Sequence, residues 1–545
     1  MMKKAIKKLL AALLAVAMVC AMAIPAFAFE SWETEEDLNK NHDYIAFQIF
    51  KGVISSKDNP TLSDVTWGSH ITHPDDFLEK LKDAPIIGAQ FHSIDATDAT
   101  DAATVQKVLA VISKWHDSDD NSIAFARFVC HYLYSNGDPQ STIVGGGGAI
   151  KIPEPGYYLI VDTINFNDGD HYHAYNSFLL VNDTHQGEYN VIINHKVVKP
   201  TVEKKVYDND NNDISSAGGW GSSADHAINE KFQFQLIAKL PAGRDEGRAY
   251  DYYDKYTVCF NDTLSEGITY DGLDSVVIES NGTPYDITND SSKYDIDISN
   301  LKSQNSFVVK IHDVKNCVAN LNDGATITVT YTAHLNDKAY VNTGSGSTEN
   351  KNSVQLQYSN NPRPGEYWGT TPKSEVYVYT YQLNNTKYRD DAKEGNELAG
   401  AGFHLYSDEE CKNEVELYQK DGFYFPIKDA TDKAQDAVEM FSDEHGQFNV
   451  KGLDAGTYYL KETTTPEGFT PCSVIPPVTI TANHNGNHVE LDSSKLSTTI
   501  INKKAGGITL PSTGGIGTTL FYVVGGGLMV AAIVLLVTKK RMENK

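Results

Sequence analysis

The chain has 545 residues, 40% of them hydrophobic, and a formal net charge of −26. This length predicts about three or four domains, each with enough apolar residues to form a core. The acidic excess excludes a nucleic-acid-binding footprint, six cysteines exclude a small disulfide scaffold, and 30 tyrosines with 41 glycines favour β-rich domains.

Residues 1–28 have the features of a secretory signal peptide. Four lysines lie within the first eight residues, and an apolar run follows from Leu9 to about Ile24. Ala26-Phe27-Ala28 then offers a small-x-small cleavage site. Because the apolar run is short and its end is cleavable, we predict secretion with removal of this segment, rather than a membrane anchor.

The first part of the mature chain, residues 29–197, combines helical and strand-like patterns. A glycine run at Gly145–Gly148 predicts a flexible turn. The predicted helices and strands are, in chain order, Ala102–Trp115, Ser122–Ser135, Tyr157–Thr163 and Ser177–Val181.

The second part, residues 198–375, is almost entirely strand-like, and residues 376–503 are also mainly β. Asn, Asp and Gly clusters separate short strands in the second part, a pattern typical of a β-sandwich. Its predicted strands are Phe232–Ala238, Tyr256–Asp262, Ser306–His312, Thr326–His334 and Ser353–Tyr358.

The C-terminal end, residues 504–545, begins with a short linker and continues as a sorting signal. Leu510, Pro511, Ser512, Thr513 and Gly514 precede an apolar stretch from Leu520 to Val537 and a basic cluster. The stretch is long enough for a transmembrane helix that retains the chain transiently, with the basic tail inside.

Together the two ends resemble those of a sortase substrate of a Gram-positive bacterium. The resemblance implies cleavage between Thr513 and Gly514, with Thr513 left as a thioester on the sortase cysteine until an amine attacks it. Loss of both ends would leave the mature chain with a formal charge of −33. Such a surface is self-repelling, which favours covalent joining over assembly by charge attraction.

Alternation along the strands places polar residues on apolar faces. In the second part, Lys204 shares a strand face with Val202 and Val206. Asp262 shares one with Val258, Phe260 and Leu264. Asn352 shares one with the residues that follow it, Val354, Leu356 and Tyr358. This parity favours Lys204 over Lys205, but it does not separate Asn352 from Asn350.

The third part repeats the arrangement. Lys387 shares a face with Leu383, although Asn385 weakens that pattern, Glu462 shares a face with Leu460, and Asn502 shares one with Ile500. The second and the third part therefore each have an early lysine, a later acid and a late asparagine.

An isolated buried charge is costly, and chemistry can remove the cost. Desolvation lowers a lysine pKa and raises a carboxyl pKa, so both groups can be neutral. A neutral amine can then attack the Asn carboxamide carbon while the acid polarises the carbonyl, and ammonia leaves. The product, a Lys–Asn isopeptide bond, would tie the first strand to the last. On residue parity alone, exposed strand ends or ordinary salt bridges remain an alternative interpretation.

Longer sequence motifs resemble those of LPXTG-anchored backbone (major) pilins with isopeptide-forming domains, the SpaA type. Residues 398–403 (LAGAGF) resemble the family's LAGAxF segment, and residues 459–463 (YLKET) with 466–469 (PEGF) resemble its E-box. Further matching motifs lie at 44–50, 62–68, 155–159, 199–206, 262–264 and 358–362.

This resemblance implies tandem Ig-like, Cna-type β-sandwich domains, the first with helical insertions. It also implies two isopeptide bonds, Lys204–Asn352 assisted by Asp262 and Lys387–Asn502 assisted by Glu462. Val161 stands where the E-box acid would be in the first part, so we predict no such bond there.

Backbone pilins of this family also carry a lysine that accepts the next subunit, within a VxVYPK-like segment. Residues 191–196 (VIINHK) align with it and place Lys196 at the lysine, although Asn194 and His195 replace the usual Tyr and Pro. Lys199, just before Pro200, is the competing candidate, and both could be ordinary solvated lysines.

Other signals are weaker. Asp208–Asp213 lacks the glycine and distal glutamate of a calcium loop, and His171 with His173 offers too few ligands, so we predict no metal site. Cys259 with Cys317 and Cys411 with Cys472 could pair. No motif of a turnover enzyme and no cofactor motif is recognised.

The sequence therefore predicts the structural shaft subunit of a sortase-assembled pilus (fimbria), which is not an enzyme and supports cell adhesion. The implied partners are a pilus-specific sortase, a housekeeping sortase with peptidoglycan, identical subunits, minor pilins and host surface ligands, with no nucleic acid. The alternative is a minor pilin or a monomeric wall-anchored adhesin.

Overall fold

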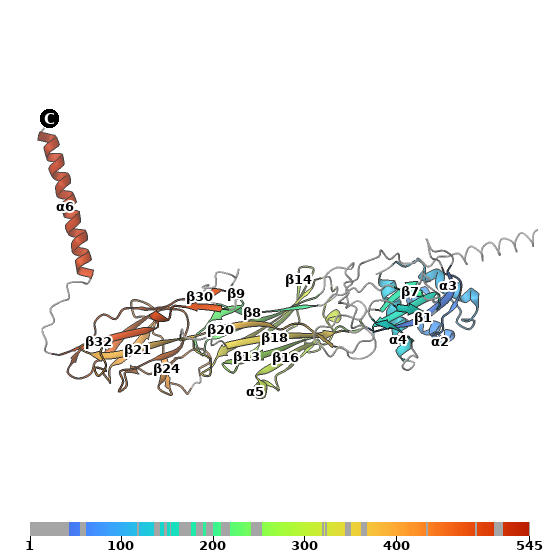
Figure 1. Cartoon of the computed structure of the whole chain (residues 1–545), viewed down its shortest axis with the longest axis horizontal. Helices are drawn as coiled ribbons and strands as arrows, with labels where there is room; N and C mark the ends of the chain where they lie inside the picture. The colour runs from blue at the N-terminus through green and yellow to red at the C-terminus, as the bar shows by residue number, and fades with distance from the viewer. Residues whose placement is uncertain are drawn as a thin grey trace, which may run out of the picture.

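A computed structural model shows an elongated, mainly β molecule whose parts follow one another along its long axis (Figure 1). It describes residues 43–54, 62–116, 119–135, 142–146, 150–152, 154–162, 176–180, 189–191, 200–208, 219–240, 253–318, 321, 324–343, 350–360, 368–431, 434–485, 488–505 and 516–543. The predicted signal peptide lies outside these residues.

The first part packs three helices against one sheet. Its strands β1 (Asp43–Ile54), β2 (Leu62–Trp67), β5 (Gly156–Asp162) and β6 (Asn176–Leu180) run in the order β2-β1-β5-β6, and β3 (Thr142–Gly146) also pairs with β1. The helices are α2 (Pro74–Lys82), α3 (Ala102–Ile112) and α4 (Asp120–Ser135). A 3-10 helix, η1 (Gly88–Gln90), and a short strand pair, β4 (Ile150–Ile152) with β7 (Tyr189–Val191), lie outside this sheet. The apolar faces of helices and sheet share one core.

Four of these elements bear on the sequence expectations. Both expected helices are present, and α2 is an additional one, which Pro74 starts and whose Phe77, Leu78 and Leu81 are buried. The predicted turn at Gly145–Gly148 is wrong for its first half, because Gly145 pairs with Tyr44 in the β1–β3 ladder.

The second part is a sandwich of two large sheets around one core. One sheet contains β8 (Thr201–Tyr207), β9 (Trp220–Gly221), β11 (Lys231–Lys239), β13 (Ile268–Ser280), β14 (Thr283–Asp286) and β17 (Thr326–Leu335), in the order β14-β13-β17-β11-β8-β9. The facing sheet has the order β10-β20-β18-β12-β16-β15, with β19 (Trp368–Thr370) also on β18. Its strands are β10 (Ser223–Asp225), β12 (Val258–Leu264), β15 (Tyr294–Asp297), β16 (Ser306–Ile311), β18 (Asn350–Ser359) and β20 (Ser374–Tyr379). All five predicted strands are present, and a short helix, α5 (Leu301–Gln304), precedes β16.

The third part has a six-stranded and a four-stranded sheet around a further core. The larger sheet runs β23-β24-β26-β21-β32-β28, from β21 (Tyr381–Arg389), β23 (Leu417–Lys420), β24 (Phe423–Pro426), β26 (Val450–Leu453), β28 (Phe469–Thr470) and β32 (Ser497–Lys504). The smaller runs β25-β22-β27-β29, from β22 (Gly402–Tyr406), β25 (Met440–Phe441), β27 (Gly456–Thr464) and β29 (Val478–Ile480). A hairpin of β30 (Ala482–Asn485) and β31 (His488–Leu491) lies beside them.

The second and third parts are packed closely together. Tyr418 and Phe425 of the third part belong to the core cluster of the second. The amide of Ile228 donates to the carbonyl of Gly452 at 2.9 Å, and an added Cβ at Gly452 would lie 2.6 Å from the Ile228 side chain. This close approach requires glycine at position 452, whose φ is also positive.

The expected boundary between 375 and 376 falls inside β20, which pairs with β18 and β10. We therefore propose the boundary at Thr380, between β20 and β21, because it leaves every sheet of both parts intact.

After β32 the described chain resumes with α6 (Ile516–Glu543), the C-terminal helix at the end of the ribbon (Figure 1). Among the residues that the structure describes, no helix meets the length and hydropathy needed to cross a membrane.

Candidate isopeptide sites

The first candidate site lies between the two sheets of the second part. Strand β8 buries Lys204 at 2% exposure, β12 buries Asp262 at 1%, and β18 buries Asn352 completely. All three residues lie on buried faces, as the alternation predicts, although Cys259 of β12 and Ser353 of β18 are buried on the opposite faces. Lys204 Nζ forms an ion pair with the Asp262 carboxylate, and both side chains are fully shielded from solvent.

A fourth side chain, Tyr331 of β17, joins the other three. Its hydroxyl lies 3.1 Å from Lys204 Nζ and donates to Asp262 Oδ1 at 3.1 Å, while Asn352 Nδ2 donates to it at 2.5 Å. Among the described residues nothing donates to Asn352 Oδ1, although this atom is buried. The carboxamide oxygen therefore has an unmet hydrogen-bonding capacity, which a proton donor would satisfy.

Burial sets the protonation of this site. It lowers the pKa of Lys204 to about 8, against the opposing attraction of Asp262. It also raises the pKa of the Asp262 carboxyl, although Lys204 and Tyr331 oppose the shift. The shifts bring the two pKa values toward each other, which makes a neutral amine beside a neutral acid accessible.

The two competing residues lie elsewhere. Lys205 is partly exposed and lies 3.5 Å from the Glu203 carboxylate. Asn350 is buried but fully engaged, because its Nδ2 donates to the carbonyls of Tyr340 and Val378 and its Oδ1 accepts from the Tyr340 amide. Geometry therefore favours Lys204 and Asn352.

The second candidate site lies in the third part, and there the lysine and the asparagine contact each other directly. Strands β21 and β32 run parallel and adjacent, with Lys387 beside Ile500 and Arg389 beside Asn502. Lys387 Nζ donates to Asn502 Oδ1 at 2.6 Å, and Asn502 Nδ2 donates to Glu462 Oε1 at 2.6 Å. Glu462, on β27 of the facing sheet, closes the triangle at 3.2 Å from Lys387 Nζ.

Aromatic and backbone contacts position this triangle. Lys387 Nζ lies 5.2 Å from the Phe403 ring centroid, and Phe403 stacks on Phe448. The Cys472 amide donates to Glu462 Oε2 at 2.9 Å. Burial lowers the pKa of Lys387, against the attraction of Glu462, which favours its nucleophilic form.

Both triads therefore place an amine, an acid and a carboxamide together in a dry interior, which is the composition needed for amide exchange with loss of ammonia. The expectation that each bond ties the first strand to the last fits the third part. It is wrong for the second, because β19 and β20 follow the strand that carries Asn352.

Sequence reasoning did not identify Tyr331. The signal is the alternation of β17, which puts Ile327, Val329 and Tyr331 on one buried face. A tyrosine there needs a partner for its hydroxyl, and this requirement could have indicated a polar site.

Several expected residues lie outside the described ranges. They are Lys196 and Lys199, the sorting residues Leu510, Pro511, Ser512, Thr513 and Gly514, the pair His171 and His173, and 209–213 of the discounted calcium loop. The cysteine pairs that the sequence left possible are not formed, and the thiols of Cys317, Cys411 and Cys472 donate to backbone oxygens. Val161, at the E-box position of the first part, is fully buried.

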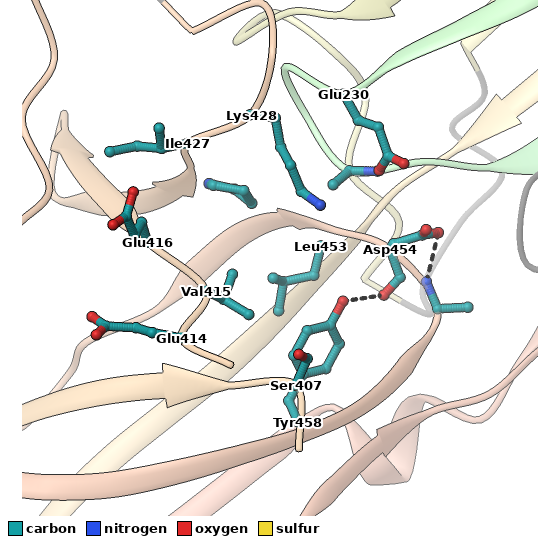
Figure 2. Close-up of a pocket in the computed structure, with 13 residues that line it drawn as sticks. Glu230, Ser407, Glu414, Val415, Glu416, Ile427, Lys428, Leu453, Asp454 and Tyr458 are labelled. Carbon is teal, nitrogen blue, oxygen red and sulfur yellow. Dashed lines mark hydrogen bonds between the residues drawn. The ribbon is translucent and has the colours of Figure 1, made fainter. Parts of the chain in front are cut away.

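A separate pocket of about 740 Å³ lies where the second and third parts meet (Figure 2). Glu230 of the second part and Glu414, Glu416 and Asp454 of the third line it, with Lys428 among them. Tyr458 donates to the carbonyl of Asp454 at 3.0 Å. None of the six triad residues lines this pocket.

Two family models and one curated relative match local stretches of the chain. Residues 383–495 match the SpaA prealbumin-like fold domain, and residues 502–544 match the LPXTG cell wall anchor motif. A stretch of 91 residues is 37% identical to serine-aspartate repeat-containing protein D of Staphylococcus aureus strain Newman. That match covers 17% of this chain and only 6% of the length of the curated relative.

Solved structures of pilins match this chain in part. The C-terminal fragment of a Streptococcus agalactiae major pilin is 21% identical, covers 56% of this chain and 99% of its own, and has a TM-score of 0.40. A Streptococcus pyogenes backbone pilin is 14% identical over 86% of this chain and 98% of its own, with a TM-score of 0.46.

The two family-model matches fit the positions of the third sandwich and of the C-terminal helix. The chain is therefore a cell-wall-anchored surface protein that carries a SpaA prealbumin-like domain and an LPXTG anchor.

Proposed function

We propose that this protein is the shaft subunit of a sortase-assembled pilus, reinforced by internal Lys204–Asn352 and Lys387–Asn502 isopeptide bonds. The observation that carries the proposal is the repeated burial of a lysine, an acid and an asparagine in two consecutive β parts. The SpaA-type domain and the LPXTG anchor support it.

In the second part, the neutral amine of Lys204 attacks the carboxamide carbon of Asn352. Asp262 gives its proton to the carbonyl oxygen, and the tetrahedral intermediate then collapses. The C–N bond to the amide nitrogen breaks, that nitrogen takes up a proton through Asp262, and ammonia leaves. One amide replaces another, so no oxidant or cofactor is consumed, and the acid is regenerated.

In the third part, Lys387 attacks Asn502 and Glu462 carries the protons. Glu462 already accepts from the amide nitrogen that becomes ammonia. The Lys387 amine lies on the carbonyl side of the same amide, so a small rotation of Asn502 exposes its carbon to attack.

Each bond closes a loop of more than 100 residues, so a chain-entropy model predicts about 4–5 kcal/mol of stabilisation by analogy with a disulfide. A crosslink of this kind would resist unfolding of a surface fibre under tension. Ordinary buried salt bridges contribute much less, because desolvation offsets their attraction.

Between subunits, Lys196 or Lys199 would attack the Thr513 acyl group that a pilus-specific sortase holds. Repetition gives an open head-to-tail fibre of identical subunits. A housekeeping sortase would join its base to peptidoglycan, and minor pilins and host ligands would bind the assembled fibre. The predicted apolar stretch from Leu520 to Val537, which lies within the match to the LPXTG anchor, would hold the chain at the membrane before sorting.

Blots of wall extracts from strains with Lys196→Ala or Lys199→Ala test the shaft assignment, with Lys351→Ala as a control at an exposed lysine that pairs with Glu375. We expect a high-mass ladder in the unmutated and control strains and its loss in one of the two variants. A single wall-linked band in the unmutated strain would instead identify a minor pilin or a monomeric adhesin.

A further inference from the structure

We propose that the junction between the second and third parts is a binding site for a divalent transition cation of the Zn²⁺ class, held by Asp208, Asp225 and His484. Asp208 directly follows β8, Asp225 ends β10 and His484 lies in β30. One ligand atom from each residue lies within 4.8 Å of the others. A metal there would join two parts of the chain that are more than 250 residues apart in sequence.

The central observation is a buried carboxylate oxygen. Asp225 is completely buried, and its Oδ1 lies 2.9 Å from His484 Nε2 and accepts from the Tyr381 hydroxyl. Its Oδ2 is also buried, but among the described residues no group donates to it. A carboxylate oxygen removed from water without a partner is costly, and a cation removes that cost.

The surrounding hydrogen bonds are those expected around metal ligands. Ser223 Oγ lies 2.7 Å from His484 Nδ1, so a proton on Nδ1 can be held by the hydroxyl while Nε2 faces the Asp225 carboxylate. The Tyr381 hydroxyl donates to the same Asp225 oxygen, Oδ1, and so helps to hold the carboxylate in place. Metal-bound histidines commonly donate their second ring nitrogen in this way, which sets the tautomer and the ring orientation.

The ligand types select the class of cation. One imidazole and two carboxylates suit Zn²⁺ and related transition ions, whereas Ca²⁺ prefers six to eight oxygen ligands. Asp208 and Asp225 bring two negative charges into a site where Asp208 is 1% exposed and the His484 side chain 1%. A divalent ion balances these charges, and a water molecule could complete four-coordination.

The ligand set differs from the discounted calcium loop. Only Asp208 is shared, and the other two ligands come from strands distant in sequence. The cation would act as a clamp, because β8 and β10 belong to the second part and β30 to the third.

Isothermal titration calorimetry of the untagged, metal-stripped full chain with ZnCl₂ tests the proposal. Titrations with CaCl₂ and MgCl₂ serve as comparisons. We expect one Zn²⁺ per chain and at least tenfold weaker binding of Ca²⁺ and Mg²⁺. His484→Gln and Asp208→Asn should each weaken Zn²⁺ binding at least tenfold. His312→Gln is the matched control, because His312 also pairs with an aspartate, Asp295 at 2.7 Å, but on an exposed surface.

A second measurement separates loss of the site from loss of folding. Circular dichroism should show each variant folded, and Zn²⁺ should slow proteolysis at the junction in the unmutated chain but not in His484→Gln. Absence of stoichiometric Zn²⁺ binding, or equal binding by folded His484→Gln and His312→Gln, would overturn the proposal. These outcomes are independent of pilus assembly.

Discussion

The candidate sites of the second and third parts use the same three residue types in different geometries. In the second part, the lysine and the asparagine come from facing sheets, and the Tyr331 hydroxyl lies between them. In the third, the lysine and the asparagine lie on adjacent parallel strands and touch directly, while the acid comes from the facing sheet. The common requirement is therefore a shared dry space and not a fixed strand arrangement.

This difference gives the two bonds different structural roles. A Lys204–Asn352 bond would join two sheets that otherwise meet through side chains. A Lys387–Asn502 bond would reinforce strands that already share a hydrogen-bonded ladder. We therefore expect loss of the first bond to be the more damaging.

The largest effect is expected for Lys204→Met, which removes the bond between sheets. The free energy of unfolding of the second part should fall by about 4–5 kcal/mol, measured by denaturant unfolding. Lys205→Met, at the adjacent and partly exposed lysine, should change it by no more than about 0.5 kcal/mol. Equal stabilities of the two variants would contradict the comparison.

A smaller loss is expected for Glu462→Gln, which keeps the shape of the acid but removes its proton-transfer role. The third part should lack its bond, and its free energy of unfolding should fall by about 2–4 kcal/mol. This loss is the smaller one because the β21–β32 ladder still joins the two strands. Intact mass and denaturant unfolding check both effects. Glu467→Gln, on an exposed loop, is the control, and a crosslink that still forms in Glu462→Gln would exclude Glu462 as the assisting acid.

The pH dependence of stability in an uncrosslinked variant tests whether burial lowers the pKa of Lys204 in the second part. In Asn352→Ala, Lys204 remains buried with a pKa near 8, below the 10.5 of an ordinary lysine. The unfolded chain then binds more protons between these values, so stability should rise with pH from about 8 to 10.5, by at most about 3 kcal/mol.

Subtracting the profile of the double variant Lys204→Met/Asn352→Ala isolates this contribution from other titrating groups. A difference profile that is flat, or that falls with pH across this window, would show that burial does not depress the lysine pKa.

The smallest effect on final stability is expected for Tyr331→Phe. Loss of the hydroxyl removes the contact that positions Asn352 and Lys204, so bond formation in the second part should slow by roughly tenfold to a hundredfold. The Lys387–Asn502 bond of the third part should form at its usual rate. Intact mass over time after folding measures both, and Tyr270→Phe, whose ring lies 5.6 Å from that of Tyr331, is the control. An unchanged rate would make Tyr331 a purely structural neighbour.

Strand alternation was sufficient to place each triad member in its core. In β8, for example, Lys204 and Val206 are buried while Glu203 is exposed. Parity could not separate Asn350 from Asn352, because both residues are buried. Their distinction depends on the backbone of residues 340 and 378, which the fold brings to Asn350.

Contacts between distant strands could not be predicted in the same way. Tyr331 joins the site only because β17 lies in the sheet that faces β12 and β18. The Asp225–His484 contact depends on how the third part docks on the second. Neither arrangement has a local sequence signal. Strand periodicity and the motifs of the pilin family, in contrast, can be read from short stretches of sequence.

The intact mass of the reduced, purified chain tests the central claim most directly. With both bonds formed, the chain should be about 34 Da lighter than its sequence mass, one ammonia for each bond, and peptide mapping should recover the 204–352 and 387–502 branched peptides. The double variant Asp262→Asn/Glu462→Gln should retain its full mass. Full mass in the unmutated chain would contradict the account and leave two buried salt bridges in a wall-anchored protein.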